Sequence, residues 1–183
     1  MTSRFGSRNR RALQLCLSGL AGLVILILSQ AGVHAQVSAN LTPVDDKAVK
    51  SMLDHDKGKV VLINFFASWC APCHQEFPDI VKLYDKYKDQ GLDVIAVSMN
   101  DATEKPDMEA FIKETKPPFT VYLTSSTEDS AYKAFYDVWN MQDGDTLPMS
   151  MIYDRAGKLQ HYYPKERNYA QMEQDITPLL AAK

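Results

Sequence analysis

The side chains best suited to chemistry in this chain are two cysteines separated by two residues. Cys70 and Cys73 lie within residues 68–78, which read SWCAPCHQEFP. Cysteines at this spacing can bind a metal ion, brace a fold as a structural disulfide, or exchange electrons by opening and closing a disulfide. The cellular compartment and the flanking residues decide between these three uses.

The amino-terminal segment, residues 1–35, indicates export. Four arginines precede an uncharged apolar run over residues 15–28, and the segment ends in Val33-His34-Ala35. This layout is typical of a secretory signal peptide, and it predicts a mature chain that begins at Gln36. A periplasmic location for residues 36–183 follows.

An uncleaved membrane anchor is the alternative for this segment. No charge interrupts residues 12–31, and about 20 helical residues just span a hydrocarbon core of about 30 Å. Both interpretations place the rest of the chain outside the cytoplasm, because the arginines hold the amino end inside.

The exported part is acidic and long enough for one domain. All 23 acidic residues but only 16 of the 20 Lys and Arg lie beyond residue 35, so residues 36–183 carry a formal net charge of −7. No basic stripe is present, which argues against a nucleic-acid partner. The third cysteine, Cys16, lies in the leader, so Cys70 and Cys73 form an isolated pair. A disulfide that closes so small a loop stabilises a fold little, which disfavours the structural use.

The pattern of apolar residues predicts strands that alternate with helices. Residues 60–66 form a continuous apolar run, as expected for a strand buried on both faces. Gly157 lies between two further strand patterns and indicates a hairpin. These elements predict an α/β domain with a mixed sheet. The expected strands are 60–66, 92–98, 119–123, 149–153 and 159–163, and the expected helices are 45–53, 72–88, 106–116, 130–139 and 168–180.

The cysteine pair lies where the first long strand gives way to a helix. Unpaired backbone N–H groups and the positive end of the helix dipole stabilise an anion there, so the thiol of Cys70 should ionise more readily than a free thiol. Pro72 is compatible with the first turn, since its missing N–H would have had no partner. Two intervening residues bring Cys73 within bonding reach of Cys70.

Two longer stretches resemble a known family. Residues 60–78, VVLINFFASWCAPCHQEFP, and residues 146–159, TLPMSMIYDRAGKL, are similar to the exported TlpA/ResA-type thiol-disulfide oxidoreductases, which belong to the redoxin or AhpC/TSA-like group. The resemblance implies a thioredoxin-like fold, with a central mixed β-sheet flanked by helices and an extra βα-type insert before residue 119. It also places Pro78 at a kink of the first active-site helix.

The resemblance implies roles for residues around the pair. Pro148 would be a cis-proline that faces the disulfide, with backbone atoms of Leu147 beside the cysteines to bind a substrate strand; the alternative is a trans proline that opens an edge strand. Glu76 would tune the thiols and move protons, or merely favour the helix amino end. Asn64 occupies the place of a buried aspartate in thioredoxin, and an amide cannot accept a proton. Trp69, next to Cys70, is expected to offer an apolar contact surface for substrate or to be a core residue.

These features predict a reductase of disulfides in periplasmic partner proteins, of the cytochrome c maturation type or related. Cys70 attacks the partner disulfide and Cys73 resolves the mixed disulfide, so no cofactor beyond this redox-active pair is needed. The resemblance implies a membrane thiol-electron transporter of the CcdA or DsbD type as electron source. One alternative is a copper- or zinc-binding metallochaperone that uses the cysteines, with Met149 and Met151 nearby as soft ligands. Another is a DsbA-like oxidase with the same fold.

Overall fold

A six-stranded mixed sheet organises the part of the chain that the structure describes. The computed structural model describes residues 41–124, 139 and 146–182. The strands are β1 (Thr42–Val44), β2 (Val60–Phe66), β3 (Leu92–Ser98), β4 (Val121–Thr124), β5 (Met149–Tyr153) and β6 (Leu159–Tyr163). The helices are α2 (Asp46–His55), α3 (Ala71–Tyr87), α4 (Lys105–Thr115) and α6 (Tyr169–Ala181), with short 3-10 helices η2 (Lys88–Gln90) and η3 (Ala102–Glu104).

β2 lies inside the sheet, whose order is β1-β4-β3-β2-β5-β6. It pairs in parallel with β3, from Val60 opposite Leu92 to Phe66 opposite Ser98, and antiparallel with β5. Every residue of β2 is buried, which explains why its sequence is an apolar run without alternation. The cysteines therefore follow directly after a strand that lies at the centre of the fold.

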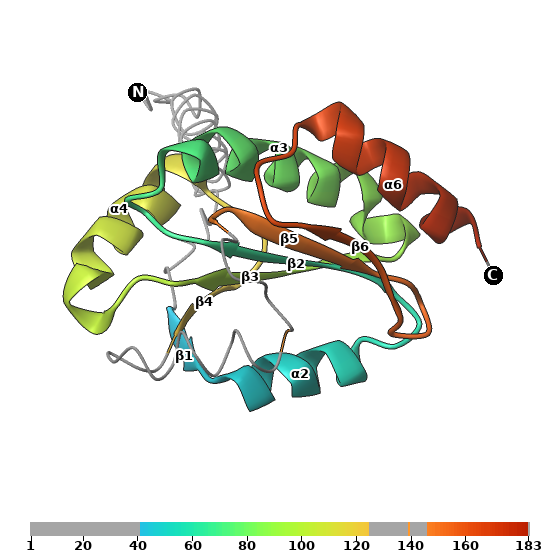
Figure 1. Cartoon of the computed structure of the whole chain (residues 1–183), viewed down its shortest axis with the longest axis horizontal. Coiled ribbons are helices and arrows are strands. Elements are labelled where there is room, and N and C mark those ends of the chain that lie inside the picture. The colour runs from blue at the N-terminus through green and yellow to red at the C-terminus, as the bar shows by residue number, and fades with distance from the viewer. Residues whose placement is uncertain (1–40, 125–138, 140–145, 183) are drawn as a thin grey trace, which may run out of the picture. The chain divides into compact units, whose positions relative to one another are not determined.

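Helices cover both faces of the sheet (Figure 1). Alternate β2 residues, including Leu62 and Phe66, pack with apolar residues of α3, α4 and α6 on one face. The intervening residues Val61, Ile63 and Phe65 pack with α2 on the other face. Asn64 shares the face of Leu62 and Phe66, since side chains alternate along a strand. A polar side chain from β2 thus lies beneath α3.

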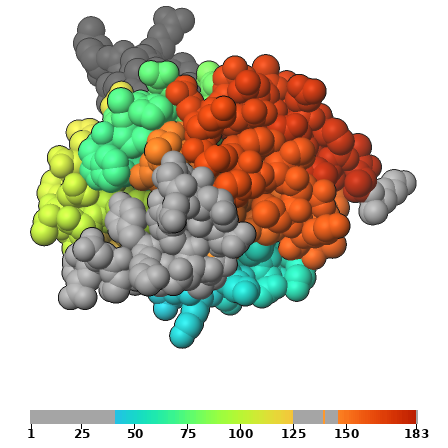
Figure 2. All heavy atoms as spheres, in the orientation of Figure 1, coloured from blue at the N-terminus to red at the C-terminus, as the bar shows by residue number. Residues whose placement is uncertain are grey.

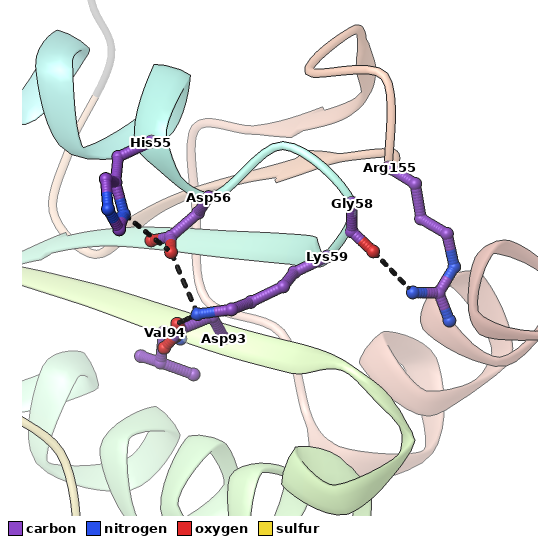
Figure 3. A network of polar contacts seen from close by, with 7 residues as sticks. All are labelled: His55, Asp56, Gly58, Lys59, Asp93, Val94 and Arg155. Atoms are coloured by element: carbon purple, nitrogen blue, oxygen red, sulfur yellow. Dashed lines mark hydrogen bonds and ion pairs between the residues drawn. The ribbon is translucent and has the colours of Figure 1, made fainter.

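A polar cluster fastens the end of β2 that lies away from the cysteines (Figure 3). Lys59 donates to Asp56 at 2.8 Å and to Asp93 at 2.6 Å, and these bonds raise the pKa of its ammonium group. Arg155, in the β5–β6 turn, donates to the carbonyl oxygens of Gly58, Gln90, Leu180 and Ala182. The turn is thereby tied to the start of β2, the end of η2 and the end of α6.

The predicted α/β fold with a mixed sheet is confirmed. The hairpin strands have the predicted bounds, and Gly157 adopts a positive φ of 76° in the turn between them. The predicted strand at 119–123 lies slightly later, at Val121–Thr124, and the lead-in contains β1, which the sequence did not predict. The expected segment 1–35 and the expected helix 130–139, except Trp139, lie outside the described residues. No helix within the described ranges has the length and apolar character needed to cross a membrane.

Candidate active site

Cys70 is the residue that caps the amino end of α3. Its backbone is extended, α3 begins at Ala71, and its Sγ accepts a hydrogen bond from the Cys73 backbone N–H at 3.3 Å. The two sulfur atoms are joined in a disulfide of 2.07 Å. Cys70 keeps 6% of its surface exposed and Cys73 only 1%. The pair therefore lies at the helix start, with Cys70 the more accessible of the two.

Glu76 is buried one helical turn after Cys73, with 2% of its surface exposed. Its Oε1 accepts hydrogen bonds from Asn64 Nδ2 at 2.9 Å and from Ser150 Oγ at 3.0 Å. Its Oε2 accepts a hydrogen bond from the backbone N–H of Arg167 at 2.7 Å. Donors from β2, β5 and the segment before α6 thus converge on one carboxyl group.

Burial and hydrogen bonding act on this carboxyl in opposite directions. Burial is the largest influence and disfavours the charged form, while the three hydrogen bonds, that of Arg167 foremost, favour it. The nearby carboxylate of Glu166 adds a smaller upward influence, and the pKa of Glu76 is raised from 4.5 to about 7. Glu76 can therefore gain or lose a proton near neutral pH, as a proton-transfer group must.

Asn64 and Ser150 form a polar pair across the two central antiparallel strands. They lie opposite each other in the register of β2 and β5, and both are buried. Asn64 Nδ2 donates to Ser150 Oγ at 3.0 Å as well as to Glu76. An aspartate at position 64 would compete with Glu76 for a proton. The Asn64 amide instead donates a hydrogen bond to the Glu76 carboxyl group.

The residues that precede β5 adopt the predicted conformation. The Leu147–Pro148 peptide bond is cis, so the trans alternative is wrong.

Trp69 has 58% of its surface exposed, and its Nε1 donates to Glu104 Oε2 at 3.2 Å. The alternative that Trp69 is a core residue is therefore wrong as well, and its role in substrate contact stays a prediction.

Comparison with known proteins identifies the family. Residues 35–162 match the model of the AhpC/TSA family. The chain belongs to this family. A thiol-disulfide oxidoreductase ResA from Bacillus cereus is 32% identical over 142 residues, which cover 76% of each chain. The thioredoxin-like protein YneN from Bacillus subtilis is 32% identical over 128 residues, which cover 69% of each chain.

A solved structure agrees with these relatives in fold and in chemistry. A DsbE-type thiol:disulfide interchange protein from Chlorobium tepidum superposes with a TM-score of 0.59 at 28% identity, covering 70% of this chain and 84% of that one. This AhpC/TSA-family chain is therefore a thioredoxin-like thiol-disulfide oxidoreductase of the ResA and DsbE type.

Several polar residues of this AhpC/TSA-family site were not predicted from the sequence. Ser150 and the backbone of Arg167 complete the environment of Glu76, and Ser150 was detectable only as a polar residue within an apolar strand. Asn100 accepts from the Ser68 backbone N–H at 2.9 Å and donates to Ser68 Oγ at 2.7 Å, which anchors the turn before the cysteines. Within the described residues, no three His, Cys, Asp or Glu side chains gather as a metal ion would require.

Proposed function

We propose that this oxidoreductase is an exported reductase that transfers two electrons from Cys70 and Cys73 to disulfides of periplasmic partner proteins. The observation that carries the proposal is the geometry of the pair: the less buried cysteine at the amino end of α3, its disulfide partner in the first turn, and a buried carboxyl with a pKa near neutrality one turn later.

The first step is attack by the Cys70 thiolate on a sulfur of the partner disulfide. A bond forms between the two sulfurs, the partner disulfide breaks, and its other sulfur leaves as a thiolate. The helix dipole and the backbone N–H of Cys73, which already points at Cys70 Sγ, stabilise the negative charge on Cys70 before the attack.

The second step is resolution by Cys73. Its thiolate attacks Cys70 Sγ, the Cys70–Cys73 disulfide forms, and the partner leaves with two thiols in place of its disulfide. Cys73 is almost fully buried, and burial disfavours a thiolate, so the free thiol must lose a proton before it attacks. Glu76, on the same helix face, accepts that proton and returns it when the pair is reduced again. Trp69 and the backbone of Leu147 contact the partner chain, and the cis bond to Pro148 sets the direction of the chain at Leu147.

The charges around the pair support the proposed direction of electron flow. Ala71 and Pro72 place no cation between the sulfurs, and an ionised Glu76, one turn after Cys73 in α3, would disfavour a thiolate on Cys73 because like charges repel. Both features stabilise the disulfide relative to the thiolates, so the reduced pair is a good electron donor. A membrane thiol-electron transporter of the CcdA or DsbD type supplies the electrons, and no further cofactor takes part.

The partner class includes the disulfide forms of apocytochromes c, copper-site assembly proteins and disulfide isomerases, with cytochrome c maturation as the leading assignment. Residues 1–35 direct export, and cleavage before Gln36 or retention through residues 12–31 would both leave the active site in the periplasm. Amino-terminal sequencing of the exported protein distinguishes these two outcomes, since only cleavage yields a chain that begins at Gln36.

Trapping experiments test the proposal. The Cys73→Ser variant should accumulate mixed disulfides between Cys70 and periplasmic proteins, whereas Cys70→Ser should not.

The reduction potential of the wild-type pair should lie nearer to about −270 mV, as in thioredoxin, than to about −120 mV, as in DsbA. A value at the oxidising end would make the protein an oxidase, and tight binding of Cu(I) or Zn(II) without disulfide reduction would favour the metallochaperone alternative.

A further inference from the structure

A pocket lies beside the cysteine pair, outside the groups assigned to electron and proton transfer. Its volume is about 290 Å³, and its walls include Trp69, His74, Asp107, Phe111 and Glu114. It is formed between the start of α3, with the turn that precedes it, and one side of α4. Figure 2 shows the green surface of this strand-to-helix junction adjoining the yellow-green surface of α4. Trp69 and His74 are the chain neighbours of Cys70 and Cys73, so the pocket lies against the segment that carries the reacting sulfur.

One face of α4 supplies the acidic side of the pocket. Asp107, Phe111 and Glu114 are spaced by four and three residues and therefore share a helix face. Lys105 and Glu109 lie on another face of α4, where they approach each other to 3.9 Å. The pocket thus presents two carboxylates on this face without a basic residue of α4 between them.

The opposite wall is aromatic and is held in place. The Trp69 ring is anchored to Glu104, and the His74 ring is anchored through Nε2, which donates to the Ser68 carbonyl oxygen at 2.6 Å. His74 meets Phe111 edge-on, with ring centroids 4.8 Å apart. Trp69 nevertheless keeps more than half of its surface exposed. Anchored aromatic rings offer contact area at little cost in conformational entropy.

The two carboxylates are available to a partner. Asp107 and Glu114 are exposed, and neither forms an ion pair or a side-chain hydrogen bond with any other residue in the described part of the chain. The carboxyl groups that serve the fold, such as Asp56 and Asp93, are by contrast engaged by Lys59. The pocket therefore combines unpaired negative charge with an exposed aromatic surface.

We propose that this pocket binds a lysine or arginine side chain of the protein substrate, located close to the substrate cysteine that Cys70 attacks. The aliphatic stem of such a residue packs on Trp69, whose face also attracts a cation, and the charged end reaches Asp107 and Glu114. A neutral side chain would gain only the apolar contact, and an acidic one would be repelled. This selectivity rests on the proposed reductase activity and specifies which disulfides the enzyme prefers.

Single-turnover reduction of matched peptides tests the selectivity. The reduced full-length protein is mixed with disulfide peptides that differ only in carrying Lys, Gln or Glu beside one cysteine. Each turnover converts one peptide disulfide to two thiols and forms the Cys70–Cys73 disulfide. The rate constant should fall in the order Lys, Gln, Glu, with the Lys-to-Gln ratio about 5, as two exposed ion pairs allow. The ratio should shrink between about 0.01 M and about 1 M salt, because the Debye length falls from about 30 Å to about 3 Å.

Two variants on α4 distinguish an effect of the pocket carboxylates from an effect of the overall net charge. Combining Asp107→Asn with Glu114→Gln should lower the Lys-to-Gln ratio markedly, leaving only the attraction of the Trp69 face for the cation. Glu109→Gln, which removes the same kind of charge from another face of α4, should leave the ratio as in the wild type. Equal ratios in all three proteins, or an equal loss in the Glu109 variant, would overturn the pocket assignment. Reduction of none of the peptides would overturn the reductase proposal itself, and with it this inference.

Discussion

The Glu76→Gln substitution should change how protein stability depends on pH. The folded protein raises the pKa of Glu76 from 4.5 to about 7, so the folded state holds this proton more tightly than the unfolded state. Where the folded state binds more protons, the free energy of unfolding falls as pH rises. At about 1.4 kcal/mol for each pKa unit, Glu76 lowers the wild-type stability by about 3 kcal/mol between pH 4.5 and 7.

Denaturant unfolding of the oxidised protein measures this effect over a series of pH values. The wild-type free energy of unfolding minus that of Glu76→Gln should fall by about 3 kcal/mol from pH 4.5 to 7 and then stay level. In the variant, a glutamine amide replaces the carboxyl group that accepts the hydrogen bond from the Arg167 N–H. Any loss of stability from this replacement does not depend on pH, so it shifts the whole difference curve without changing its slope. The exposed acid Glu109, replaced by Gln, controls for the loss of one charge.

The direction of the slope decides the physical argument. A difference curve that is level between pH 4.5 and 7 and drops only as the pH falls below about 4.5 would mean that the three hydrogen bonds outweigh burial and that Glu76 is an ordinary, stably ionised carboxylate. A curve that is flat over the whole pH range, below about pH 4.5 as well as above it, would mean that the two influences cancel. Either result would remove the basis for assigning proton transfer near neutral pH to this group.

Further substitutions test the packing and the polar contacts. Phe77→Ala should lower the free energy of unfolding by about 3–5 kcal/mol, because the ring is buried against three other phenylalanine rings; a loss below about 1 kcal/mol in denaturant unfolding would contradict this. Arg155→Ala should cost about 1–3 kcal/mol in the same assay, because four carbonyl groups lose a charged donor, while Lys158→Ala serves as the exposed control. Ser150→Ala should raise the pKa of Glu76 further, because the lost hydrogen bond favours the carboxylate; carbon-13 NMR titration of the carboxyl would show the opposite shift if this is wrong.

The sequence predicted the elements whose signals are local. The apolar run of β2 and the turn at Gly157 marked a buried strand and a hairpin, and the structure has them at those residues. The three-residue strand β1 was missed because it is too short for a periodic pattern and contains Pro43, which is compatible only with an edge position. β1 exists through its parallel pairing with β4, about 80 residues further along the chain.

The same distinction applies to the site. The spacing of the cysteines and the place of Glu76 on their helix face were accessible from the local sequence, whereas the cis bond before β5 was predicted only from the resemblance to a known family. The groups that set the pKa of Glu76 were not, because its donors come from residues 12, 74 and 91 positions away. No periodicity or spacing within one segment indicates that such distant groups converge.

The contact from residue 167 to Glu76 has a consequence for how this site can vary. The donor is a main-chain N–H, so every amino acid except proline is able to provide it. The Arg167 side chain is used elsewhere, in an ion pair with Asp175, so a substitution there would break that ion pair while the carboxyl of Glu76 kept its main-chain partner, and one of the three contacts on which the acidity of Glu76 depends carries no side-chain signature.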